Sequence, residues 1–159
     1  MGHMTTLERL TADLTTSMKA RTAFQTNTLR QMIAAVRTAE KAGSVARELT
    51  EEQLQSVLSA EAKKRRESAQ IYTTAGAGER AATETSEADL IESYLPAALS
   101  IEQLGVIVSD AIAATGAATI KDMGKVMKVA TASAAGVGRL DSKALSDRVR
   151  SALTGASGV

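Results

Sequence analysis

Apolar side chains recur every three or four residues along the first 96 residues, which is the spacing of amphipathic helices. The opening run places them at Leu7, Leu10, Leu14 and Met18. The pattern predicts helices over about 5–20 and 22–42, a long helix between Thr50 and Gly76, and a shorter acidic helix over about 79–94.

Short polar motifs support the ends of these helices. Thr50 and Gln53 form a capping box, in which each side chain accepts a hydrogen bond from the backbone of the other. Gly43 is suited to end the second helix, and the segment 76–78, which contains two glycines, breaks the third.

Pro96 marks the predicted boundary between two parts of the chain. It is the only proline, and proline disfavours a helical conformation in the residue before it. Ser100 and Gln103 then form a second capping box, which starts a new helix. We therefore expect a four-helix unit over 4–96 and a three-helix unit over 97–154, with its helices over about 101–115, 120–134 and 142–154.

Single residues mark the ends of these three helices. Gly116 is suited to end the first, Thr119 to cap the second and Asp141 to cap the third. Residues 155–159 are predicted to be a flexible tail. Residues 1–3 resemble the remnant of a cleaved expression tag, so Met4 is taken as the natural start.

The composition favours helices over sheets. Hydrophobic residues make up 44% of the chain but aromatic residues only 2%, so the core must be built from aliphatic side chains and methionine. No run alternates as a strand would. The predicted fold class is all-α, an N-terminal four-helix bundle joined to a small C-terminal three-helix bundle.

Residues typical of catalysis are scarce. The chain has no cysteine, and its one histidine, His3, lies in the tag-like segment. The commonest general base and the commonest metal ligand are therefore missing from the rest of the sequence. We predict no catalytic residue, no metal site and no cofactor. No apolar run has the length of a membrane span and no signal peptide is visible, so we expect a cytoplasmic protein.

The charge balance moves the search for function to local clusters. The net charge is only +1, far from the strongly basic balance typical of nucleic-acid-binding proteins. The two parts of the chain differ, however. Residues 1–96 hold 12 basic and 13 acidic side chains, whereas residues 97–159 hold 7 and 5. The small C-terminal part is the more basic one.

Three lysines in this part are predicted to share a helix face. On a helix over 120–134, Lys121, Lys125 and Lys128 fall within about 60° of each other, opposite the apolar residues. Arg139 follows in a glycine-containing turn. Gly124, in the middle of the helix, indicates either close approach of a ligand or tight helix packing inside the domain. The pattern favours a cationic binding surface.

A second cationic run, 63–66, lies on the long third helix. There Lys63 and Arg66 are predicted to point outward together, either as an ordinary solvated surface or as a phosphate-contacting patch. Arg65 falls within the apolar stripe, one turn after Glu61. We expect these two to form an ion pair, because a lone buried charge is costly.

The order and spacing of several motifs resemble the YqeY family, small bacterial proteins similar to the C-terminal tail of the B subunit of the tRNA-dependent amidotransferase. The likeness covers nearly all of 5–154. The motifs are 64–68 with Tyr72 and Ala75-Gly76, then Tyr94-Leu95-Pro96, 121–127, and Gly138-Arg139 with Asp141.

The resemblance implies two helical bundles and a role with tRNA, because the equivalent tail of the amidotransferase holds the tRNA body while catalysis occurs on other domains. We therefore expect a non-catalytic helical module that binds tRNA or a tRNA-processing protein. The residues expected to contact nucleic acid are Lys121, Gly124, Lys125, Lys128, Arg139, Lys63 and Arg66. Ala97 and the segment 129–137 lack basic residues that are usual in the family pattern, which lowers the expected RNA affinity.

Two other functions stay open at this point. The chain can be an adaptor whose helices accept a partner helix, or, through the same resemblance, a glutamine-dependent carbon–nitrogen ligase. Binding that weakens steeply with salt would favour nucleic acid, because phosphate contacts release counterions.

Overall fold

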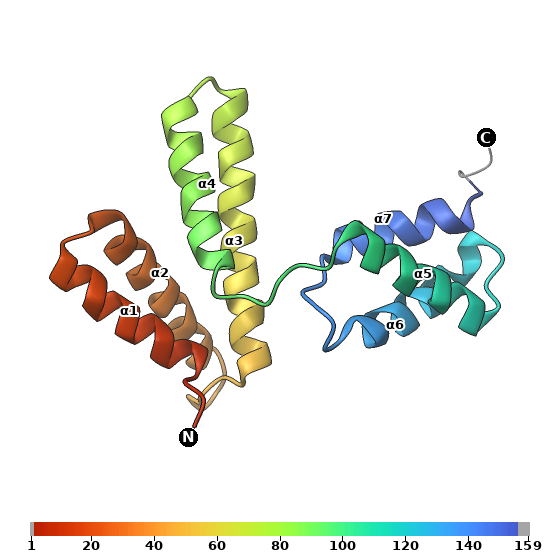
Figure 1. Ribbon diagram of the computed structural model, residues 1–159, viewed down its shortest axis with the longest axis horizontal. Helices are drawn as coiled ribbons and strands as arrows, with labels where there is room; N and C mark the ends of the chain where they lie inside the picture. The colour runs from red at the N-terminus through yellow and green to blue at the C-terminus, as the bar shows by residue number, and fades with distance from the viewer. Residues whose placement is uncertain (1, 156–159) are drawn as a thin grey trace. The chain divides into compact units, whose positions relative to one another are not determined.

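The computed structural model of the protein describes residues 2–155, in which helices are joined by non-helical segments (Figure 1). Over this range it has seven α-helices, one 3₁₀ turn and no strand, which confirms the predicted all-α class. The elements are α1 (Thr6–Ala20), α2 (Ala23–Glu40), α3 (Glu51–Thr74), α4 (Gly78–Glu92), α5 (Ile101–Thr115), η1 (Ile120–Asp122), α6 (Met123–Ala134) and α7 (Ser142–Leu153). The chain divides into two compact units: the N-terminal unit ends at Leu95, and the C-terminal unit begins at Pro96.

The four helices of the N-terminal unit form two hairpins. α1 packs mainly against α2, and α4 packs along its length against α3. In Figure 1 the α1–α2 hairpin lies beside the lower part of the α3–α4 hairpin, whose upper part extends beyond it. In this extended part the buried apolar side chains are small, as at Ala69 and Ala81. Small residues let the two helices approach each other closely.

The core of the N-terminal unit forms where the two hairpins meet. Leu10 of α1, Met32 of α2, Leu58 of α3 and Ile91 of α4 are all at most 1% exposed. Burial of each such side chain contributes about 1.5–3 kcal/mol. The core of this unit is therefore built mainly from aliphatic side chains and methionine, contributed by all four helices.

Tyr94, in the turn after α4, ties the end of this unit to α1. Its hydroxyl donates a hydrogen bond to the Asp13 carboxylate, and the Arg9 guanidinium lies 5.1 Å from the ring centroid. Burial raises the pKa of the Tyr94 phenol, and the bond to Asp13 raises it further. The phenol therefore stays a hydrogen-bond donor over a wider range of alkaline pH than an exposed tyrosine would. The chain is fixed in this way immediately before Pro96.

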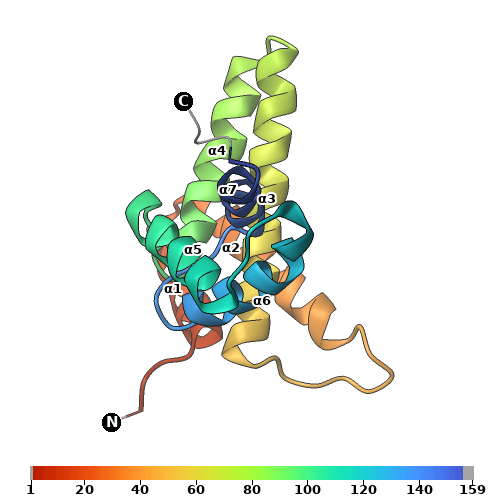
Figure 2. The same ribbon diagram turned by 90° about the vertical axis from the view of Figure 1, so that its right-hand side faces the viewer.

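The C-terminal unit is a separate group of three α-helices, seen from another side in Figure 2. α5 packs mainly on α6, and α7 contacts both. Its core is aliphatic, with Val126 of α6 and both Leu145 and Val149 of α7 fully buried. Ile107 and Val108 of α5 complete the contact.

The predicted caps are confirmed at three helix starts. The Thr50 and Ser100 side chains accept hydrogen bonds from the backbone N–H groups of Gln53 and Gln103. The side chains of these glutamines in turn accept from the backbone N–H groups of Thr50 and Ser100. The Asp141 carboxylate accepts bonds from the first turn of α7. Side-chain oxygens at these positions satisfy backbone N–H groups that have no partner inside the helix.

The prediction of one continuous helix over 120–134 is wrong at its start. Residues Ile120–Asp122 form the 3₁₀ turn η1, and the α-helix begins only at Met123. The reason lies in the Asp122 carboxylate, which folds back to accept the backbone N–H groups of Ala118 and Thr119 at 3.0 and 3.2 Å. These bonds lower the pKa of Asp122.

A short backbone contact joins the entry of the C-terminal unit to the turn before α7. The Arg139 N–H donates to the Ala97 carbonyl at 2.9 Å, and the Leu99 N–H donates to the Arg139 carbonyl at 3.0 Å. Gly138 permits this approach, because an added Cβ would lie 3.0 Å from the Ala97 carbonyl oxygen. Here glycine is required by space rather than by its backbone angles.

The predicted tail, 155–159, lies outside the described residues except for Gly155, and of the predicted tag remnant residue 1 lies outside them. Within 2–155, no single helix is long and apolar enough to cross a membrane. One pair of consecutive helical segments, Ile101–Thr115 and Ile120–Ala134, has the length and composition of a membrane span when the two are taken together, but the pair is bent by 98°.

Candidate nucleic-acid interface

The lysine patch, defined as Lys121, Lys125 and Lys128, lies on η1 and α6. All three side chains are exposed, whereas Val126 and Ala130 of the same helix are fully buried. The two α6 lysines keep the spacing of one helix turn, so their side chains are neighbours. Lys121 precedes them on the tighter turn of η1. The helix thus divides into a cationic surface and a core surface, as its sequence predicted.

No carboxylate within residues 2–155 forms an ion pair with these three lysines. The nearest acidic residue in the sequence is Asp122, whose carboxylate accepts the backbone N–H groups described above. It also interacts electrostatically with Lys125 without forming an ion pair, so it offsets part of the positive charge of the patch. Three hydrated ammonium groups on one small surface attract a polyanion such as a phosphate backbone.

Gly124 lies in the first turn of α6 and is exposed. An added Cβ would find no neighbour within 4 Å beyond its own chain neighbours and helix backbone. The alternative prediction, that this glycine serves tight helix packing inside the domain, is therefore wrong. Close approach of a ligand remains the prediction for Gly124.

Arg139 lies in the turn between α6 and α7 and has a structural role through its backbone. Its Nε also donates to the Pro96 carbonyl at 3.4 Å, which is a long and weak hydrogen bond. The rest of the guanidinium forms no ion pair with a described residue. Arg139 is thus held beside Pro96 with most of its donors available, and within residues 2–155 no hydrogen bond connects it to the lysine patch.

The second cationic run, 63–66, is largely neutralised by nearby carboxylates. The Arg66 guanidinium contacts Asp89 at 2.7 Å and Glu92 at 2.8 Å, both on α4. The hydrogen bond to Glu92 and, to a smaller extent, the bond to Asp89 raise the pKa of Arg66. The Lys64 ammonium pairs with Glu61 at 3.3 Å. Of the four cations only Lys63 has no ion-pair partner among the described residues, so this surface offers a phosphate much less net charge.

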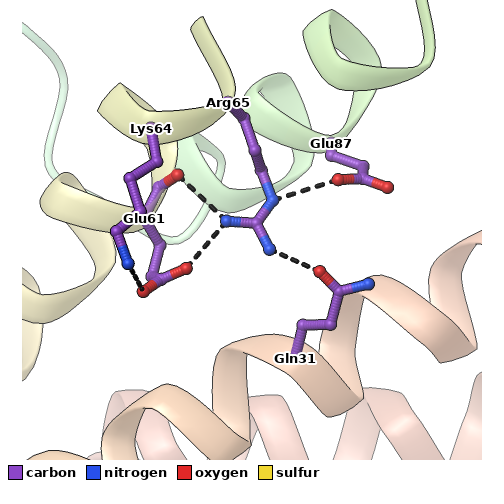
Figure 3. A network of polar contacts seen from close by, with 5 residues as sticks. All are labelled: Gln31, Glu61, Lys64, Arg65 and Glu87. Atoms are coloured by element: carbon purple, nitrogen blue, oxygen red, sulfur yellow. Dashed lines mark hydrogen bonds and ion pairs between the residues drawn. The ribbon is translucent and has the colours of Figure 1, made fainter. Parts of the chain in front are cut away.

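Arg65 forms a buried network that joins three helices (Figure 3). Its guanidinium contacts the Glu61 carboxylate at 2.8 Å, as predicted, and the Glu87 carboxylate of α4 at 3.0 Å. It also donates to the side-chain carbonyl of Gln31 on α2. Burial acts to raise the pKa of Glu61, but the bonds from Arg65 and Lys64 outweigh it and hold that pKa below its usual value. The network holds the two hairpins together.

Sequence reasoning missed the partners that come from distant helices. Glu61 and Arg65 are four residues apart on one helix, so their spacing was sufficient to predict the pair. Glu87 and Gln31 lie 22 and 34 residues from Arg65 in the sequence. An acidic residue on the fourth helix was the only signal for Glu87, and five such residues were available there.

The lysine patch has the charge and exposure that suit the binding of an anion. Within 2–155, no group of three or more His, Asp or Glu side chains is placed as a metal site. The lysine patch offers donors and positive charge to phosphate oxygens, and those are the groups that position a protein on a nucleic-acid backbone.

Comparison with known proteins gives the family. No curated protein matches the chain closely. The family model described as Yqey-like protein matches residues 7–153, which spans all seven helices almost completely. This match agrees with the motifs at 94–96 and 121–127 and with the all-helical fold. The chain belongs to the YqeY family.

Proposed function

We propose that the protein is a non-catalytic helical module that binds tRNA through its C-terminal unit. The observation that carries the proposal is the lysine patch, whose three exposed cations have no ion-pair partner in the described part of the chain. Membership of the YqeY family agrees with a helical module of this kind. The four-helix and three-helix bundle organisation and a cytoplasmic location belong to the same proposal.

The patch would act through phosphates rather than through bases. Lysine is a compact, strongly hydrated point charge that suits the sugar–phosphate backbone, and the patch contains no aromatic side chain on which a base could stack. The protein would therefore recognise the shape and charge of a folded RNA. Arg139, with most of its guanidinium donors available, would add one further contact.

The test is the salt dependence of tRNA binding. Labelled tRNA is titrated with the protein at several salt concentrations, and the anisotropy gives the dissociation constant. The logarithm of the association constant should fall linearly with the logarithm of the salt concentration, by about 0.7–0.9 for each phosphate contact. No binding at low salt would contradict the proposal and favour a protein partner that handles tRNA.

The alternative of a glutamine-dependent ligase has a separate test. We expect the purified protein to release no ammonia from glutamine above a boiled control, because the sequence after the tag-like segment contains neither cysteine nor histidine to serve as nucleophile or base. Ammonia release that persists through repurification would overturn this expectation.

A further inference from the structure

A large open cavity lies in the N-terminal unit, far in the sequence from the lysine patch. Its volume is about 620 Å³, and it is bounded by α1, the end of α2, the segment before α3 and the start of α3. Its floor is apolar: Val36 and Leu54 belong to the core, and Leu7 and Leu49 pack against it. We call this cavity the acid-rimmed groove.

Small side chains on α1 leave the groove open. Thr11, Ala12 and Thr15 line it and are exposed, where larger apolar residues would fill it. The α1 residues on its wall extend from Leu7 to Thr15, which is about 12 Å of helix at 1.5 Å per residue. A groove wall of that length matches about two turns of a partner helix.

The rim is strongly acidic. Four glutamates line the groove, against one basic residue, Arg37. Arg37 pairs with Glu40 at 3.1 Å. The other three glutamates, Glu8, Glu48 and Glu51, form no ion pair within residues 2–155.

These three carboxylates are held in different ways. Both oxygens of Glu51 accept hydrogen bonds from Thr6, and one oxygen of Glu8 accepts from the Thr5 N–H. Neutral donors of this kind leave the negative charge in place. Glu48 is exposed on the segment before α3. The groove therefore combines an apolar floor with uncompensated negative charge along its edge.

We propose that the acid-rimmed groove binds a cationic amphipathic helix of a partner protein, with apolar side chains on the floor and Lys or Arg against the glutamates. Charge complementarity selects this occupant, since opposite charges across an interface steer and orient the partner and like charges oppose binding. A nucleic acid is repelled by the same rim. The chain's own cationic helix, α6, cannot serve in a second copy, because its apolar side is buried in its own core.

The experiment uses the full chain and labelled synthetic peptides of about 14 residues. This is close to the shortest length at which an isolated peptide still forms a helix in water. One peptide has leucines on one face and lysines elsewhere, the second has glutamates in place of the lysines, and the third is a scrambled form of the first. The lysine peptide should bind at least about tenfold more tightly than either of the others, because the rim repels glutamate and the floor needs an ordered apolar face.

Two matched pairs of variants locate the binding. Glu48→Lys should weaken the lysine peptide at least about tenfold, whereas Glu67→Lys, an exposed charge reversal on α3 outside the groove, should not. Ala12→Leu should weaken it by filling the groove with a good helix former. The control, Ala34→Leu, places the same change on an exposed position of α2 that does not line the groove.

Three results would overturn the proposal. Equal binding of the lysine and glutamate peptides would remove the role of the rim. Equal losses in Glu48→Lys and Glu67→Lys would show general charge attraction only. A dimer in sedimentation that Ala12→Leu dissociates would make a second copy the occupant. None of these results bears on tRNA binding, which is measured without peptide and depends on the other unit.

Discussion

The two units both carry a run of cations on one helix, but the surroundings of the two runs differ. On α3, the cations at 64–66 each have a carboxylate partner, provided by α3 itself or by α4. On η1 and α6, the lysine patch has none among the described residues. The densest basic run in the sequence is therefore mainly a structural element, and the sparser one is the better candidate for binding.

The difference arises from what each helix faces. α3 packs against an acidic helix, α4. The cationic side chains that extend from α3 towards α4 therefore pair with Asp89, Glu87 and Glu92. α6 contacts α5 and α7 through its apolar side and leaves its lysines to solvent. A count of positive charges along the sequence does not distinguish these cases, because the partners come from another part of the chain.

The largest expected effect concerns the structural run. Arg65→Met should lower the free energy of unfolding of the N-terminal unit by about 3 kcal/mol, since it leaves Glu87 without a cation and Glu61 with only the exposed Lys64. The Glu61 and Glu87 side chains are only 18% and 17% exposed. Urea unfolding followed by tyrosine fluorescence reports this unit selectively, because both tyrosines, Tyr72 and Tyr94, lie in it.

The control for this change is Lys63→Met, one of the neighbouring exposed positions. It should shift stability by less than about 0.5 kcal/mol. Equal effects of Arg65→Met and Lys63→Met would mean that the run is a plain solvated surface, and the contrast between the two units would fail.

A second effect concerns Gly138 in the C-terminal unit. Gly138→Ala should cost about 1–2 kcal/mol, because its Cβ would press on the Ala97 carbonyl and the Leu99 side chain, the latter at 3.1 Å. Hydrogen exchange of the amides in α7 measures the loss directly. Unchanged protection would show that the entry segment is free to shift and that the contact does not stabilise the unit.

Gly124 should respond in the opposite direction. Gly124→Ala should stabilise the C-terminal unit by up to about 1 kcal/mol, since alanine is a better helix former and the space around the Cβ is open. Gly124→Leu should nevertheless weaken tRNA binding by blocking close approach of the backbone. If tRNA binds Gly124→Leu as well as it binds the wild-type protein, the glycine has no role in binding.

The smallest expected effect is the pH dependence that Glu61 gives to the N-terminal unit. Its pKa lies below its usual value of 4.5, so its ion pairs stabilise the unit above that pH, and the contribution is lost as the pH falls through the lowered value. Glu61→Gln should therefore flatten the acid side of the stability profile and leave the slope above neutrality unchanged. A steeper acid slope in the variant would contradict this sign.

Local sequence rules predicted most of the fold but less of the candidate site. The starts of α3, α5 and α7 followed from the capping residues Thr50, Ser100 and Asp141, each of which bonds to a residue within four positions of it in the sequence. The 3₁₀ turn of η1 did not follow, because it depends on one carboxylate folding back. Local spacing placed the lysines correctly on the solvent side, but it could not show which cations find partners across a helix pair.

The most direct test of this account reverses matched lysine pairs in the two units and measures tRNA binding over a range of salt concentrations. Lys125→Glu with Lys128→Glu should reduce affinity strongly and lower the salt slope by about 0.7–0.9 for each phosphate that the protein no longer neutralises. Lys63→Glu with Lys64→Glu, the same charge change in the N-terminal unit, should leave the slope nearly unchanged. The account would be contradicted if the second pair abolished binding and the first did not.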